Sequence, residues 1–154
     1  MNRFGRWTRR VLALVAAAIA ALLVASLAHS LFVQQALREV GARIPPGTAV
    51  STMVRDLLGL APALGAVILV ALTLGFLIAA VVLRLVPQLS EIAWPLAGWA
   101  ALATALWLMQ LAYGFSPLAG ARTAAGFIAI SLGGAVGGWV FGRLAGSTVR
   151  PAST

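Results

Sequence analysis

The 154-residue sequence contains no cysteine, no lysine and only three acidic residues, Glu39, Asp56 and Glu91. The absence of cysteine excludes disulfides, thiolate metal sites and Cys-X-X-Cys redox chemistry. Charged residues make up 9% of the chain, whereas a soluble domain carries about 25%. Arginine supplies all the basic charge, and together with abundant alanine and glycine this is typical of a GC-rich bacterial genome.

Hydrophobic residues, in contrast, make up 62% of the chain, and the mean hydropathy is +1.02. This composition predicts an integral membrane protein of one domain. The net charge of +8 does not indicate nucleic-acid binding, because the sequence has no dense basic helix or aromatic-basic sheet pattern. The arginines instead fall in loops and at the ends of apolar runs, which is where membrane proteins carry the basic residues that set their orientation.

Four apolar runs predict four transmembrane helices, at residues 11–33, 62–86, 92–113 and 121–145. A basic N-terminus, residues 1–10, and a polar tail, residues 146–154, flank this single domain. The first run is about 34 Å long as a helix, enough to cross a hydrocarbon core of about 30 Å. The apolar core of a signal peptide is only about 7–15 residues long, so we expect a retained anchor, although Ser26-Leu27-Ala28 resembles a cleavage site.

The segment between the first two spans, residues 34–61, predicts an outer loop with its own short helix. Pro45-Pro46-Gly47 interrupts the chain, and apolar residues then recur at spacings of three and four: Met53, Val54, Leu57, Leu58 and Leu60. This pattern is typical of an amphipathic helix lying on the membrane surface. The sequence therefore predicts an all-α fold, a bundle of four transmembrane helices with a short interfacial helix in the first outer loop.

The distribution of arginines predicts the orientation. If all four runs cross the membrane, seven arginines lie on the side of the two termini: Arg3, Arg6, Arg9, Arg10, Arg84, Arg143 and Arg150. Four lie on the opposite side: Arg38, Arg43, Arg55 and Arg122. Since cytoplasmic loops carry the excess of basic residues, we expect both termini in the cytoplasm and the protein in a bacterial inner membrane.

The last span contains a row of glycines at every fourth position, which resembles a glycine zipper: Gly134, Gly138, Gly142 and Gly146. Gly133 and Gly137 form a second, partly overlapping row. Residues four apart share one helix face, and small residues allow helix backbones to approach closely in a bilayer. The row therefore predicts a partner helix. The alanines at positions 17, 21 and 25 (Ala17, Ala21 and Ala25) form the best candidate within the chain, and a second copy is the alternative.

Few polar residues are candidates for a site. His29 is the only histidine, and a functional role would be haem or metal ligation, proton transfer, or a hydrogen bond to a quinone or lipid headgroup. The alternative is an interfacial imidazole that reaches water. Asp56 and Arg122 are expected to pair on the outer side, because Arg122 opposes the dipole of its helix. Arg84 and Glu91 form a second candidate ion pair on the inner side.

The sequence contains no paired carboxylates, Ser-His-Asp set, phosphate loop or metal-ligand spacing. It therefore predicts no catalytic residue, no metal and no cofactor. The favoured function is that of a non-enzymatic membrane protein acting through helix–helix association, by self-assembly or as an accessory subunit of a larger complex. Its predicted partners are the lipid bilayer, itself or that complex, and no nucleic acid. The alternatives are a small oligomeric transporter or channel, and a lipid- or quinone-handling enzyme that uses His29.

Overall fold

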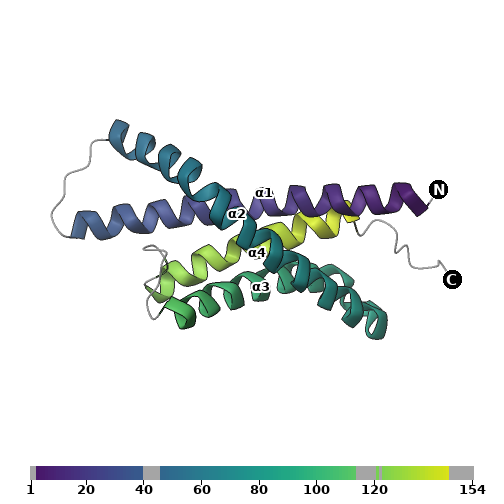
Figure 1. The fold of residues 1–154 in the computed structure, drawn as a ribbon. Helices are drawn as coiled ribbons and strands as arrows, with labels where there is room; N and C mark the ends of the chain where they lie inside the picture. The colour runs from purple at the N-terminus through teal and green to yellow at the C-terminus, as the bar shows by residue number, and fades with distance from the viewer. Residues whose placement is uncertain (1–2, 40–45, 114–120, 122, 146–154) are drawn as a thin grey trace.

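The computed structural model describes residues 3–39, 46–113, 121 and 123–145, and all regular structure within these ranges is helical. Helix α1 comprises Arg3–Glu39, α2 comprises Pro46–Leu85, α3 comprises Ser90–Tyr113 and α4 comprises Ala124–Ala145 (Figure 1). A short 3₁₀ helix, η1 (Pro87–Leu89), joins α2 to α3.

Each of the four α-helices contains a stretch long and apolar enough to cross a membrane: Trp7–Glu39, Pro62–Leu85, Glu91–Ala112 and Ala124–Ala145. A membrane helix satisfies its backbone hydrogen bonds internally, which is why such sequences form helices rather than open sheets. The predicted all-α fold with four spanning helices is confirmed. The chain has the architecture of a multi-pass membrane protein.

The predicted interfacial helix is not a separate element. Residues 46–61 continue directly into the second span, so α2 is one helix of 40 residues, about 60 Å long. Pro62, expected in the first turn of a new helix, lies inside α2. Proline is tolerated within membrane helices, because neighbouring groups can satisfy the carbonyl that it leaves without a donor. Pro46 and Gly47, expected to break the chain, are the first two residues of α2, and no break separates residues 48–61 from the second span.

Two helix ends are fixed by identifiable hydrogen bonds. The Thr123 hydroxyl accepts a hydrogen bond from the Gly126 N–H at 3.1 Å, so Thr123 caps α4, which begins three residues later than expected. At the other end of α4, Arg9 Nε–H donates to the Leu144 carbonyl at 2.9 Å. That carbonyl is one of the last four of the helix and has no partner within it. This bond also brings the start of α1 and the end of α4 together.

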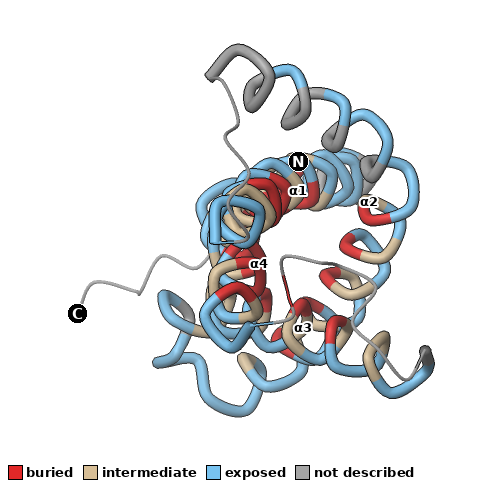
Figure 2. Tube along the Cα trace, turned by 90° about the vertical axis from the view of Figure 1, so that its left-hand side faces the viewer, coloured by how far each residue is buried: buried red, intermediate tan, exposed pale blue. Residues whose placement is uncertain are grey.

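The four helices form a ring in which α4 is the most buried member (Figure 2). Within its most apolar window 44% of residues are buried, against 22–33% for the others. Helix α4 packs along α1 on one side and along α3 on the other. Helix α2 crosses α1 diagonally, packs against α1 and α3, and touches α4 at few places (Figure 1).

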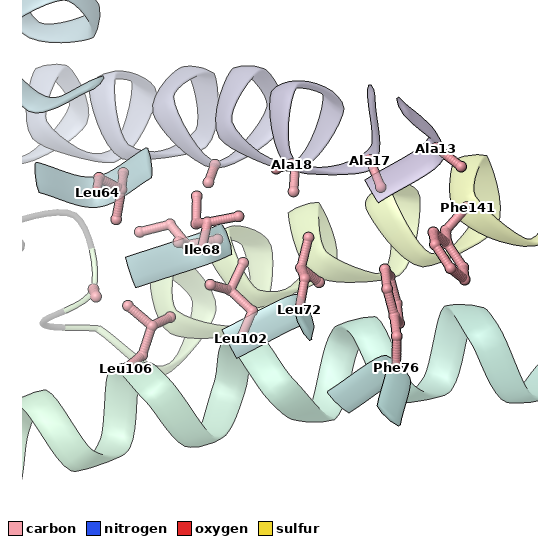
Figure 3. Close-up of a cluster of buried hydrophobic side chains, with 14 residues drawn as sticks. Ala13, Ala17, Ala18, Leu64, Ile68, Leu72, Phe76, Leu102, Leu106 and Phe141 are labelled. Carbon is pink, nitrogen blue, oxygen red and sulfur yellow. The ribbon is translucent and has the colours of Figure 1, made fainter. Parts of the chain in front are cut away.

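The core lies between α2 and the other three helices (Figure 3). Helix α2 contributes a row of large apolar side chains at every fourth position, all at most 5% exposed: Leu64, Ile68, Leu72 and Phe76. Opposite this row lie Leu102 and Leu106 of α3, Phe141 of α4 and small alanines of α1. The spacing of four places the α2 row on one helix face, which is the face that turns inward.

Candidate functional site: the two faces of α4 and the polar end of α1

One face of α4 lies against α1 through the second glycine row. A Cβ atom added at Gly137 would lie 2.7 Å from the Ala17 carbonyl oxygen and 3.0 Å from the Ala21 Cβ. A Cβ atom added at Gly133 would lie 2.9 Å from the Ala21 carbonyl oxygen and 3.4 Å from the Ala25 Cβ. Backbone therefore packs directly on backbone here, and a side chain at either glycine would push the helices apart.

The adjacent face of α4 lies equally close to α3. A Cβ atom at Gly134 would overlap the Gly98 carbonyl, and one at Gly138 would overlap the Trp94 carbonyl. A Cβ atom added at Gly142, one turn further along, would lie 3.1 Å from Trp94 Cδ1, a side-chain atom rather than a backbone carbonyl. The fourth member of the predicted row, Gly146, lies outside the described residues.

The structure thus separates the two glycine rows by partner. The alanines of α1 pack against Gly133 and Gly137, and the row that begins at Gly134 packs against α3 rather than α1. Gly98, which supplies the α3 side of this contact, was not predicted from the sequence. A local signal was present, since Ala97, Gly98 and Ala101 put small residues on α3 at helical spacing. Ala97 and Ala101 also lie against Gly75 of α2.

A hydrogen bond between side chains reinforces the α3–α4 contact. Trp99 Nε1–H donates to the Ser131 hydroxyl oxygen at 3.1 Å, and the hydroxyl in turn donates to the Ile128 carbonyl at 2.9 Å. Ser131 is completely buried. Serine and threonine hydroxyls within helices commonly bond to the backbone of their own helix, and the bond from Thr73 to the Leu69 carbonyl at 2.6 Å is a second example.

An aromatic cluster joins α2, α3 and α4 near the end of α4. The rings of Phe76 and Phe141 stack with their centroids 4.3 Å apart, and Trp94 lies at 4.9 Å from Phe141 and 5.9 Å from Phe76. Such pairs are stabilised beyond their buried area by the ring quadrupoles. The cluster has a structural role, because it fills the space beside the Trp94–Gly138 contact.

The outer part of α1 carries three buried polar side chains, Ser26, His29 and Ser30, each at most 7% exposed. Helices α1 and α4 are antiparallel, so His29 lies about one turn beyond the Ala25–Gly133 contact, toward the start of α4. Of the alternatives for His29, an imidazole that reaches water does not agree with this burial, whereas a structural or a functional histidine does. The Ser26 hydroxyl has no hydrogen-bond partner in the described structure. A buried, unsatisfied hydroxyl costs about 1–3 kcal/mol, so this end of α1 is a candidate polar site.

The two predicted ion pairs stay predictions. Arg122 and the side chain of Asp56 lie outside the described residues. Arg84 is the penultimate residue of α2, and Glu91 is the second residue of α3, on either side of η1. Both side chains are exposed. Among the described residues, no group of three His, Asp or Glu side chains gathers where a metal ion could be held.

Comparison with protein families, with curated proteins and with solved structures found no match. The class of the protein therefore follows from its own architecture. It is a multi-pass membrane bundle of four helices in which α4 contacts α1 and α3 through backbone-to-backbone packing.

Proposed function

We propose that the protein is a non-enzymatic membrane protein that acts through helix–helix association, either with itself or as an accessory subunit of a larger complex. The observation that supports this proposal is the α2 arm, residues 46–61. The arm continues α2 for about 24 Å beyond the candidate span Pro62–Leu85 and leaves the bundle (Figures 1 and 2).

Both glycine rows already have partners within the chain, so they do not supply a surface for association. The α2 arm does supply one. Leu58 is 70% exposed on it, and Arg55 is exposed as well. An exposed leucine on a helical segment that extends beyond the span is a position at which another helix can pack.

Site-specific photo-crosslinking in intact membranes tests this function. A photoreactive residue in place of Leu58 is expected to give one discrete crosslinked species. The matched control is Leu108, which is 58% exposed on α3 and faces away from the core. A crosslink to the same chain identifies self-assembly, and a crosslink to one other membrane protein identifies an accessory subunit. Crosslinking only to lipid at Leu58, as at Leu108, would contradict the proposal.

We also propose the location and orientation predicted from the sequence, a bacterial inner membrane with both termini in the cytoplasm. The Arg9–Leu144 bond supports the placement of both termini on one side of the membrane, because it requires α1 to begin where α4 ends, and the excess of arginines on that side favours the cytoplasm. Reporter fusions after Thr154 and within the turn at residues 44–47 are expected to report opposite sides. A periplasmic signal from the C-terminal fusion would contradict the proposal.

A second candidate, supported by the burial of His29 with Ser26 and Ser30, is handling of a quinone or lipid. An imidazole and two hydroxyls on adjacent turns can hydrogen-bond a carbonyl or headgroup in a medium where few other donors exist. Protein purified in mild detergent would then carry quinone or lipid that is lost in His29→Ala and kept in Ser131→Ala. Equal content in both variants would eliminate this candidate.

A further inference from the structure

The junction where α1 begins and α4 ends carries an exposed group of arginines and tryptophans. Arg9 and Arg10 of α1 and Arg143 of α4 are exposed, as are Trp7 and Trp139. The Arg9–Leu144 bond brings the α1 arginines to the residue that follows Arg143. Beyond their value as markers of topology, these arginines have no part in the helix–helix association proposed above.

Arg143 lies next to the lipid-facing side of α4. Its guanidinium carbon lies 4.9 Å from the centroid of the Trp139 ring, a cation–π arrangement. Trp139 in turn ends a stripe of exposed apolar residues, at spacings of three and four, that faces away from both glycine rows: Ile128, Leu132, Val136 and Trp139. The stripe therefore leads along the surface of the bundle directly to the arginines.

We propose that this junction, defined as Arg10 and Arg143 with Trp139, binds the headgroup of an anionic phospholipid. The phosphodiester would lie between guanidinium groups from two helices, and guanidinium is the side-chain group best suited to bidentate phosphate recognition. Trp139 would lie at headgroup level, where indoles are enriched, and an acyl chain would follow the apolar stripe of α4.

Charge complementarity decides between anionic and zwitterionic lipid. Of the three acidic residues, Glu39 ends α1 at the opposite end of the bundle and Asp56 lies in the first part of α2, whereas Glu91 lies near the end of α4, because Trp94 of the same helix contacts Gly138 and Gly142. The exposed Arg9, Arg10 and Arg143 outnumber this one carboxylate, so the junction keeps a net positive charge. The opposed dipoles of the antiparallel ends of α1 and α4 largely cancel, so the arginine charges set the sign of the local field. A net positive site at the membrane surface favours a lipid that carries a net negative charge.

Native mass spectrometry of the purified full-length protein tests this proposal, with phosphatidylglycerol and phosphatidylcholine titrated separately. We expect phosphatidylglycerol to bind more tightly and the double variant Arg10→Gln/Arg143→Gln to weaken its binding about 30-fold. Arg9 is left unchanged because it bonds to α4. The matched control is Arg84→Gln, which neutralises an exposed arginine at the end of α2.

Four results would overturn the proposal, and three of them come from the titrations. These are equal affinity for the two lipids, an equal loss of binding in Arg84→Gln, and displacement of the lipid by inorganic phosphate at the same concentration. The thermal unfolding midpoint of each variant is measured as well. We expect the lipid affinity to depend on the arginine charges and not on the stability of the fold. A double variant with an unchanged midpoint and unchanged phosphatidylglycerol binding would also count against it.

Discussion

Helices α4 and α2 solve the same packing problem in opposite ways. Helix α4 presents glycine to its neighbours, so that its backbone contacts the backbones of α1 and α3. Helix α2 presents Leu64, Ile68, Leu72 and Phe76, whose side chains fill the space between the other helices. In a bilayer the lipid chains are as apolar as leucine, so both solutions depend on close contact rather than on the hydrophobic effect. The difference lies in what each surface tolerates.

Enlarging a glycine at the α4 contacts is expected to destabilise the fold. In the inward row of α2, shortening a large side chain is expected to destabilise it. A glycine that touches a carbonyl has no space for a methyl group, and its neighbour is a backbone that cannot rotate aside. A buried leucine leaves a cavity when it is shortened, because the surrounding helices collapse only partly. The following variants separate these two behaviours.

The largest effect is expected for Gly138→Leu, since the new side chain would occupy the position of the Trp94 carbonyl and of Pro95. We expect the free energy of unfolding in detergent to fall by about 3 kcal/mol or more, with loss of the folded monomer. Val136→Leu on the lipid-facing side of the same helix is the control and should change it by less than about 0.5 kcal/mol. Equal stability of the two variants would contradict the packing of α4 on α3.

A smaller loss is expected when Leu72 of α2 is replaced by alanine. The cost in a membrane is that of the cavity, about 1–3 kcal/mol, because both the folded and unfolded side chains are in an apolar medium. Leu74→Ala, at a position 57% exposed to lipid, removes the same atoms without a cavity. Denaturant titration monitored by tryptophan fluorescence measures both. If Leu74→Ala costs as much as Leu72→Ala, the row at residues 64–76 does not form the core.

The Trp99–Ser131 hydrogen bond is expected to contribute less. Hydrogen bonds between membrane helices are worth about 0.6 kcal/mol on average, so Ser131→Ala should destabilise the fold by about that amount. A double-mutant cycle with Trp99→Phe isolates the interaction between the two side chains. A coupling energy of zero would show that the two side chains do not interact.

The smallest effect is expected for Gly65→Ala on α2. Its added Cβ would lie 3.7 Å from the Leu22 Cδ2, an ordinary van der Waals distance. The free energy of unfolding should change by less than about 0.5 kcal/mol, in contrast to Gly137→Ala, where the Ala17 carbonyl lies at 2.7 Å. Unfolding of these two variants side by side compares a glycine with space for a methyl group and a glycine without it. A large loss for Gly65→Ala would place α2 closer to α1 than the structure does.

The sequence was sufficient to predict the four spans and the need for a partner along the glycine row, because apolar length and i, i+4 spacing are local properties. It was not sufficient to assign the partner. Gly133 and Gly134 are neighbours in the chain, yet they face different helices, about 100° apart around α4. The helix that packs against each face of α4 depends on where α2 and α3 lie in the bundle. That placement is a property of the tertiary fold.

The continuity of α2 and the burial of His29 escaped prediction for similar reasons. Pro62 is equally acceptable in a first turn and inside a membrane helix, so its presence does not locate a helix start. The depth of His29 along its span suggested access to water. Its burial follows from the position of α1 within the bundle, which no residue of α1 specifies alone.

Disulfide crosslinking tests the central claim, that the glycine faces of α4 are filled from within the chain. The native sequence has no cysteine, so any disulfide that forms within the chain must join the two introduced cysteines. The Ala25 Cβ and a Cβ at Gly133 would lie 3.4 Å apart, close to the separation of about 3.8 Å found in disulfides. The control pair is Ala25→Cys with Val136→Cys, since Val136 is on the lipid-facing side of α4 and a cysteine there displaces no backbone, whereas a Cβ at Gly138 would overlap the Trp94 carbonyl. We predict that oxidation of membranes carrying Ala25→Cys/Gly133→Cys yields a crosslinked monomer and that the control pair yields none. A disulfide-linked dimer from either single variant, with no intramolecular bond in the pair, would contradict the account.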